Sequence, residues 1–176
     1  MDIQNKLKNA IRNVPDFPKS GINFKDITPI MQDPMLSNQV LDCLYKNYLK
    51  SGVDVIAGLE SRGFLFGYPL AMRLGVPFVL VRKKGKLPYE KISLEYELEY
   101  GKSTIEMHTD SIQRGQRVLI HDDLLATGGS AEAVAQLITK MGGEIIGFDF
   151  LVELEFLNGR QKLNRFSDNI STFVTY

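Results

Sequence analysis

Two adjacent acidic residues followed by a turn of small residues are the most informative feature of the sequence. Asp122 and Asp123 end an apolar run, and Ala126-Thr127-Gly128-Gly129-Ser130 leads into a helical pattern. Small residues let backbone N–H groups approach an anion, and a helix N-terminus favours negative charge, so this turn is suited to a phosphate. The two carboxylates would repel that phosphate and need hydroxyl groups or a cation instead. A sugar phosphate carries both hydroxyls and a phosphate, and is therefore the predicted ligand.

Two other segments could bind an anion beside this turn. Glu60-Ser61-Arg62-Gly63 lies between a predicted strand and a predicted helix, which places its amides at a sheet edge; a plain strand-to-helix turn has the same pattern. Arg82-Lys83-Lys84-Gly85-Lys86 follows another predicted strand. A run of charges is usually a solvated face, but the neighbouring Gly85 and Pro88 favour a mobile cationic loop at the same edge.

Hydrophobic periodicity predicts strands alternating with helices. We expect strands at residues 53–58, 76–81, 94–100, 117–122, 144–152 and 171–176, with 103–109 as a possible partner of 94–100 in an inserted hairpin. We expect helices at residues 3–14, from 34 until Gly52, and at 64–74, 129–141 and 159–163, with an irregular excursion over 15–29. This alternation predicts an α/β fold with a mostly parallel sheet covered by helices on both faces.

Composition excludes several classes of protein. The 21 basic and 21 acidic residues give a formal net charge of zero, so no global field would attract nucleic acid. No apolar stretch approaches the roughly 20 residues of a membrane span. The single cysteine, Cys43, excludes an intrachain disulfide, and His108 and His121 have no metal-ligand spacing. Neither a Rossmann fingerprint nor a Walker loop is present. We expect a cytoplasmic protein that binds neither nucleic acid nor membranes.

The segment from Asp122 to Ser130 resembles the donor-binding motif of the type I phosphoribosyltransferases. Residues 58–64 and 98–102 make the chain similar to the adenine phosphoribosyltransferases, which belong to the purine-specific members of this family. The likeness extends from residues 17–29 to 151–154. The resemblance implies one domain over residues 1–176, built on a twisted, mostly parallel sheet. It also implies a small N-terminal hood at about residues 1–33 and a flexible hairpin lid at about residues 83–105.

The resemblance assigns a role to each motif. Asp122 and Asp123 would bind the ribose hydroxyls of phosphoribosyl pyrophosphate. The turn would bind the 5′-phosphate through Ala126, Thr127, Gly128, Gly129 and Ser130. The pyrophosphate would be bound by Glu60, Ser61, Arg62, Arg82, Lys83 and Lys86, with a cis peptide bond between Glu60 and Ser61.

The same resemblance names the residues around the base. Glu99 would act as general acid/base on the purine imidazole ring, with Tyr100 helping to close the site and Arg62 also catalytic. Alternation alone does not distinguish Glu99 from the other acids of its strand face. Phe24 would stack on adenine beside Lys25, where most relatives have arginine. His121 stands where relatives have an apolar residue, and we expect a packed, hydrogen-bonded core histidine.

The implied reaction belongs to purine salvage: a pentosyl transfer of 5-phosphoribose to adenine that gives AMP and pyrophosphate. The implied cofactor is Mg²⁺, bound mainly through substrate oxygens without direct protein ligands, and the implied assembly is a homodimer. Three alternatives stay open at this point. They are transfer to another base (hypoxanthine, guanine, xanthine or orotate), a non-catalytic regulator that senses phosphoribosyl pyrophosphate, and an unrelated sugar-phosphate binding module.

Overall fold

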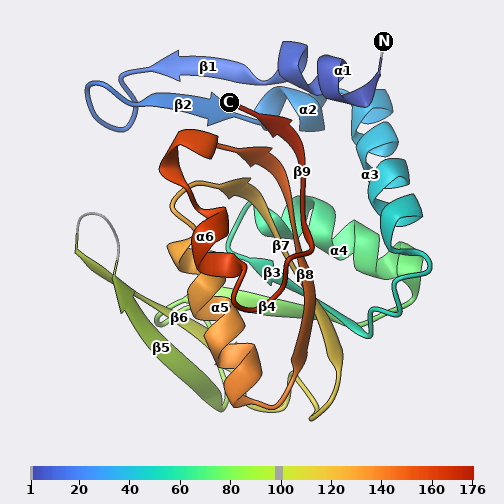
Figure 1. Cartoon of the computed structure of the whole chain (residues 1–176), viewed down its shortest axis with the longest axis vertical. Coiled ribbons are helices and arrows are strands. Elements are labelled where there is room, and N and C mark those ends of the chain that lie inside the picture. The colour runs from blue at the N-terminus through green and yellow to red at the C-terminus, as the bar shows by residue number, and fades with distance from the viewer. Residues whose placement is uncertain (1, 98–100) are drawn as a thin grey trace.

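The computed structural model describes residues 2–97 and 101–176, which form a seven-stranded sheet, a separate two-stranded sheet and the helices around them (Figure 1). The helices are α1 (Ile3–Ala10), α2 (Thr28–Gln32), α3 (Pro34–Tyr48), α4 (Gly63–Leu74), α5 (Gly129–Lys140), the 3-10 helix η1 (Glu155–Leu157) and α6 (Arg160–Leu163). The strands are β1 (Arg12–Pro15), β2 (Asn23–Asp26), β3 (Val55–Leu59), β4 (Phe78–Lys83), β5 (Lys91–Glu97), β6 (Lys102–His108), β7 (Arg117–Leu125), β8 (Glu144–Glu153) and β9 (Ile170–Thr175).

The large sheet confirms the predicted α/β architecture. Its strand order is β5-β6-β4-β3-β7-β8-β9, and the five strands from β4 to β9 in this order run parallel. Parallel strands need crossover helices, and these cover both faces. Successive residues of a strand face opposite sides of the sheet and pack in two different cores. Ala57 of β3 packs in the cluster that contains α5, while its neighbour Ile56 packs in the cluster that contains α3 and α4.

The N-terminal hood is more regular than the sequence suggested. The first helix ends at Ala10 rather than continuing to residue 14, and Arg12–Pro15 forms β1, which pairs antiparallel with β2. The predicted irregular excursion therefore contains a strand. Val14 lies opposite Phe24 in this hairpin, and this pairing between distant residues outweighs the helical spacing of Val14, because a β-branched residue fits a strand well. The hairpin lies across one end of the large sheet (Figure 1).

Two other boundaries correct the sequence prediction at the site. Strand β4 continues to Lys83, so Arg82 and Lys83 lie within the strand rather than in a loop after it. Strand β7 continues through both aspartates to Leu125, where it pairs with Glu153 of β8, so the acids lie within the strand rather than after it. The predicted hairpin is present as β5 and β6, and it extends the sheet through an antiparallel pairing of β6 with β4. Leu98, Glu99 and Tyr100 lie outside the described residues, so their predicted roles are not tested here.

Candidate active site

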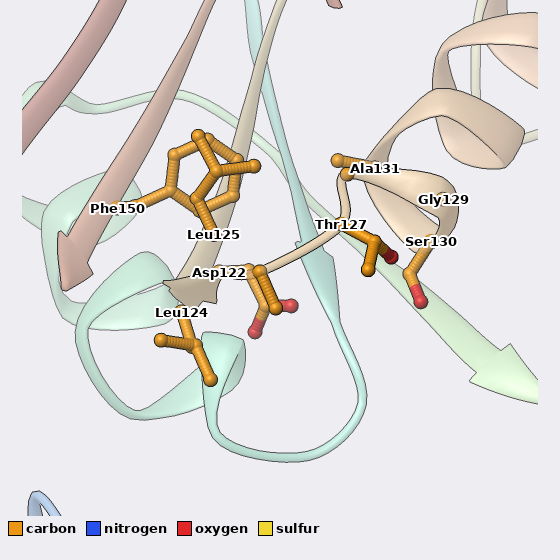
Figure 2. Close-up of a pocket in the computed structure, with 10 residues that line it drawn as sticks. Asp122, Leu124, Leu125, Thr127, Gly129, Ser130, Ala131 and Phe150 are labelled. Carbon is orange, nitrogen blue, oxygen red and sulfur yellow. The ribbon is translucent and has the colours of Figure 1, made fainter. Parts of the chain in front are cut away.

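The turn between β7 and α5 surrounds a small cavity of about 80 Å³. The hydroxyls of Thr127 and Ser130 and the carboxylate of Asp122 lie around it, as Figure 2 shows. Gly128 caps α5 with φ of +78°, a conformation that L side chains rarely adopt. A Cβ atom at Gly128 would also lie 2.6 Å from the carbonyl oxygen of Gly159. Glycine at this position therefore allows the tight turn that opens the N-terminus of α5 to an anion.

The two aspartates face different surroundings although they are adjacent. Asp123 is 4% exposed, and its backbone N–H donates to Oδ1 of Asp122 at 2.9 Å. Burial, together with the charge of Asp123, raises the pKa of Asp122 well above its usual range. Burial also raises the pKa of Asp123, against the opposing influence of the Arg62 guanidinium. Polar ligands that donate hydrogen bonds, such as sugar hydroxyls, would relieve this cost of keeping both acids ionised.

Arg62 connects the aspartates to the hood. Its Nε lies 3.0 Å from Oδ2 of Asp123, although the N–H is not directed at that oxygen, which has no hydrogen-bond partner among the described residues. Its guanidinium carbon lies 5.0 Å from the ring centre of Phe24. The peptide bond between Glu60 and Ser61 is cis, as the family resemblance implied. Arg62 therefore contacts Asp123, which is predicted to bind the ribose, and Phe24, which is predicted to stack on the base.

Gly63 allows α4 to approach β7 closely enough for this contact. A Cβ atom at Gly63 would lie 2.8 Å from the carbonyl oxygen of His121 and 3.0 Å from Oδ1 of Asp122. Only a residue without a side chain fits this approach of helix to strand.

The basic segment is arranged around an acid. Glu60 accepts two hydrogen bonds from the Arg82 guanidinium, at 3.2 and 3.3 Å, and one from the Lys83 backbone N–H at 2.9 Å. Burial alone would raise the pKa of Glu60, but these donors outweigh burial and lower it. A second cavity, of about 60 Å³, is lined by Glu60, Arg82 and Lys83 together with Asp122 and Ser130. The structure thus brings the predicted pyrophosphate residues next to the turn at residues 126–130, which we call the phosphate turn.

Two of the predicted pyrophosphate residues contribute differently from the others. The Lys86 side chain is exposed, and its backbone carbonyl accepts a hydrogen bond from Arg82 at 3.0 Å. Ser61 is also exposed, and its carbonyl accepts from the Phe64 backbone N–H. Lys86 thus helps to hold Arg82 in position in this structure.

The two predicted adenine ligands lie in different environments. Phe24 faces Arg62, whereas Lys25 donates to Oδ1 of Asn13 at 2.5 Å and has its Nζ 3.8 Å from the ring centre of Tyr176. Burial lowers the pKa of Lys25. Lys25 therefore joins the hood hairpin to the end of the chain, and it borders a separate, largely apolar cavity of about 400 Å³.

Comparisons with known proteins match this geometry. A family model described as a phosphoribosyl transferase domain matches residues 32–168. An adenine phosphoribosyltransferase of Acetivibrio thermocellus is 54% identical over 171 residues, covering 97% of this chain and 99% of the relative. The crystal structure of adenine phosphoribosyltransferase from Thermoanaerobacter pseudethanolicus matches with a TM-score of 0.94 at 50% identity, covering 98% of this chain and 99% of that chain. The Saccharomyces cerevisiae enzyme, complexed with an imino-altritol bisphosphate and adenine, matches with a TM-score of 0.90 at 42% identity, covering 97% and 98%.

The chain belongs to the phosphoribosyltransferase family.

Behind the donor motif, this phosphoribosyltransferase has a buried polar network. His121, which is fully buried, shares a hydrogen bond of 2.9 Å between its Nδ1 and Oδ2 of Asp149, and the Tyr48 hydroxyl donates to Oδ1 of Asp149 at 3.0 Å. This confirms the predicted hydrogen-bonded core histidine. Its Nε2 is buried without a hydrogen-bond partner among the described residues. A neutral ring with its proton on Nδ1 leaves only a lone pair unsatisfied, so the network favours that tautomer.

Two residues of the phosphoribosyltransferase site had no signal in the sequence analysis. Gly159 lies behind the phosphate turn, where a Cβ atom would be 2.3 Å from the carbonyl oxygen of Ala126. Tyr96 reaches the turn from β5, with its hydroxyl 3.1 Å from the Ser130 hydroxyl. Gly159 was recognisable only as a helix start, and Tyr96 only as the inward residue of an alternating strand.

The described part of this phosphoribosyltransferase contains neither a cluster of metal-ligating side chains nor a membrane-spanning helix. Among residues 2–97 and 101–176, no group of three or more histidine, cysteine or acidic side chains could hold a metal ion. Over the same residues, no helix combines the length and apolar character that crossing a bilayer requires.

Proposed function

We propose that this protein transfers 5-phosphoribose from phosphoribosyl pyrophosphate to N9 of adenine, releasing AMP and pyrophosphate. One observation carries the proposal. The paired acids Asp122 and Asp123, the phosphate turn that ends at Ser130, and Arg62 meet at one edge of the sheet, with Arg62 Nε 3.0 Å from Asp123. This set can bind a phosphate, a sugar and a second anion side by side. The names of the relatives specify adenine as the base.

The reaction breaks the bond between the anomeric carbon and pyrophosphate and forms a bond from that carbon to N9. Positive charge develops on the ribose ring, as in glycoside hydrolysis, and negative charge develops on the leaving group. In our proposal Asp122 and Asp123 accept hydrogen bonds from the ribose hydroxyls, and the backbone amides of the turn hold the 5′-phosphate. Arg62 and Arg82 offer positive charge to the pyrophosphate, and fixing both substrates in line supplies much of the acceleration.

The base-handling residues complete the proposal. We assign Glu99 as the general acid/base that exchanges the proton of the purine imidazole ring, a step that contributes roughly 10²–10⁴-fold in rate for this class of catalysis. Tyr100 and the rest of the lid at residues 83–105 would exclude water, which would otherwise hydrolyse the activated sugar. Phe24, which already faces Arg62, would stack on the base. The assignments of Glu99 and Tyr100 rest on the sequence resemblance alone.

The residues present fit Mg²⁺ bound mainly through substrate oxygens. A hard ion that retains much of its water shell suits a site in which the substrate supplies most ligands. The described residues contain no protein cage that would replace those ligands, and Asp122 and Asp123 would hold the ribose hydroxyls beside the ion. When bound, Mg²⁺ would neutralise charge on the pyrophosphate. Addition of a chelator should therefore abolish product formation, and excess Mg²⁺ should restore it.

The direct test is to mix the protein with Mg²⁺, phosphoribosyl pyrophosphate and one base at a time, and to measure nucleotide and pyrophosphate. We expect AMP with adenine, and no comparable product with guanine, hypoxanthine, xanthine or orotate. Product with another base would change the substrate assignment. Donor binding without pyrophosphate release would indicate a sensor or an unrelated sugar-phosphate module, although the zero net charge gives no support for DNA binding.

Two substitutions test the assigned roles. Glu99→Gln should lower kcat far more than the affinity for phosphoribosyl pyrophosphate, and near-normal turnover would refute the acid/base role. Asp123→Asn should weaken donor binding, because the buried carboxylate would no longer accept the ribose hydroxyls as an anion. Unchanged donor affinity, measured by titration calorimetry, would contradict the ribose role of Asp123.

A homodimer is also part of the proposal, and an exposed apolar face supports it. Tyr68 and Phe78 pack edge to face beside a cavity of about 450 Å³ that Phe64 and Leu80 also line. Leu65 of α4 is also exposed on this helix. Such a patch on a soluble domain often marks a protein interface. Sedimentation at micromolar concentration should give a dimer, and Tyr68→Lys should shift it towards monomer; a monomeric wild type would refute this. The single domain over residues 1–176 and the cytoplasmic location remain predictions.

A further inference from the structure

The lid hairpin is attached to the phosphate turn by a tyrosine for which the mechanism above has no use. Strand β5 alternates between exposed polar or charged residues and partly buried residues, and Ile92, Leu94 and Tyr96 pack against the core that includes α5. The ring of Tyr96 is thus held by the core, which fixes where its hydroxyl lies. The hydroxyl is the last polar group on this face before the undescribed residues 98–100.

The Tyr96 hydroxyl shares a hydrogen bond with the hydroxyl of Ser130 at 3.1 Å. Ser130 belongs to the first turn of α5 and lines both the phosphate-turn cavity and the cavity bordered by Glu60 and Arg82. The backbone of β5 is close as well, because a Cβ atom at Gly129 would lie 3.5 Å from the carbonyl oxygen of Glu97. Strand β5 of the lid hairpin therefore lies against the predicted phosphate site.

When a phosphate binds to the turn, the hydrogen bond between the Tyr96 and Ser130 hydroxyls can have only one donor. In this structure either hydroxyl can be the donor. A phosphate dianion only accepts, so a Ser130 that donates to phosphate must accept from Tyr96. The resulting chain, from Tyr96 to Ser130 to phosphate, is charge-assisted at its end and polarised along its length. Phosphate binding should therefore strengthen the contact that holds the lid strand, and by linkage the contact should strengthen phosphate binding.

We propose that Tyr96 is a positioning residue that couples the lid hairpin to the 5′-phosphate site through the Ser130 hydroxyl. The inference rests on the proposed function for the identity of the ligand, and it adds a residue and a coupling that the reaction itself does not specify. A tyrosine that packed against the core only for stability would not need its hydroxyl. The test must therefore remove the hydroxyl and keep the ring.

Tyr96→Phe makes this change, and ribose 5-phosphate and inorganic pyrophosphate serve as separate probes. We expect the dissociation constant of ribose 5-phosphate to rise about 3- to 10-fold, the range for one hydrogen bond in a network. Pyrophosphate affinity should change less than ribose 5-phosphate affinity, because the Tyr96 hydroxyl bonds to Ser130, although both residues also line the cavity bordered by Glu60 and Arg82. Tyr45→Phe is a matched control, because Tyr45 lies on α3 and its ring packs against Arg73. It should leave both affinities unchanged.

A double-mutant cycle with Ser130→Ala tests the route. In the Ser130→Ala background, Tyr96→Phe should have no further effect on ribose 5-phosphate, whereas Ser130→Thr should retain the effect because it keeps a hydroxyl. The proposal is overturned if Tyr96→Phe leaves ribose 5-phosphate affinity unchanged, tightens it, weakens only pyrophosphate, or acts equally with and without the Ser130 hydroxyl. The AMP assay on the wild type separates this failure from failure of the proposed function, since an active wild type with an unaffected Tyr96→Phe variant refutes only the coupling.

Discussion

The approach of α4 to β7 at Gly63 offers a sharp test of how the site is positioned. Gly63→Ala adds one methyl group at the point where the helix that follows Arg62 meets the strand that carries the aspartates. That carbon would lie 2.8 Å from the carbonyl oxygen of His121 and 3.1 Å from Cα of Asp122. Both obstacles are backbone atoms in the centre of the sheet, so the helix end must move instead.

The structure sets the size of the effect. Moving the carbon from 2.8 Å to an ordinary contact near 3.4 Å requires a shift of about 0.6 Å. A misplacement of about 1 Å at a site can cost about 10²-fold in rate, so we expect kcat/KM for phosphoribosyl pyrophosphate to fall about 10-fold or more. Overpacking costs about 1–3 kcal/mol of stability. Replacing glycine in a helix interior returns up to about 1 kcal/mol, but Gly63 is the first residue of α4, so we expect a net loss of about 1–2 kcal/mol.

Gly67→Ala, one turn along the same helix, is the control. There a Cβ atom would meet side-chain atoms, Cε2 of Phe78 at 2.9 Å and Cδ2 of His121 at 3.1 Å, which lie behind the site. Steady-state kinetics and thermal unfolding of both variants give the comparison. We expect Gly67→Ala to keep kcat/KM within about 2-fold of the wild-type value, at a melting temperature similar to that of Gly63→Ala. Wild-type kinetics for Gly63→Ala, or equal losses of activity in the two variants, would refute the positioning argument.

Three further substitutions test other parts of the structure. Burial and the charge of Asp123 raise the pKa of Asp122 above the model-compound value of 3.8, so the unfolded chain releases this proton at lower pH than the folded protein does, and the free energy of unfolding falls as pH rises through the interval. Asp122→Asn should remove this fall, so that without added ligand the variant is more stable than wild type at pH 7 but not at pH 3, while it binds ribose 5-phosphate more weakly. Urea denaturation at both pH values and calorimetry check this, and equal stability at pH 7 would contradict it. Tyr48→Phe removes a hydrogen bond to the buried Asp149 carboxylate and should cost about 1.5–3 kcal/mol in urea denaturation. A loss below about 0.5 kcal/mol, under the range for even a neutral hydrogen bond, would contradict this contribution. Tyr176→Ala removes the ring beside the Lys25 ammonium and should raise KM for adenine about 2- to 5-fold without changing KM for the donor; Tyr176→Phe keeps a ring and should behave like wild type.

Local patterns in the sequence identified most elements of the large sheet. The buried strand at residues 53–58 and the helix that Gly75 closes are short, strongly patterned segments, and the structure places them as β3 and α4 with Gly75 at φ of +70°. The start expected for the helix at residue 34 is also found, because the Asp33 carboxylate caps α3 by accepting from the backbone N–H groups of Met35 and Leu36. Caps, turns and alternation depend on neighbours in the chain, so they can be read without the fold.

Contacts between distant segments were not accessible in the same way. Val14 continues the helical spacing of the first segment, and only its pairing with Phe24 makes it part of a strand. The alternation of residues 94–100 predicted a strand but could not indicate that Ser130 lies beside Tyr96. Neither the spacing nor the residue types could show that Asp149 accepts hydrogen bonds from both Tyr48 and His121. These partners are set by sheet order and crossover packing, which a single sequence determines only through the complete fold.

Arg62 lies between two predicted subsites. Its positive charge lies against Asp123, where it opposes the cost of burying that acid, and its guanidinium lies near Phe24. In the proposed complex the ribose hydroxyls satisfy Asp123, and the arginine is needed at the pyrophosphate. Donor binding would thus release the same side chain from the acid and from the aromatic platform of the hood. Because Arg62 contacts both predicted subsites, we expect that occupation of one would change the affinity of the other through the position of this guanidinium group.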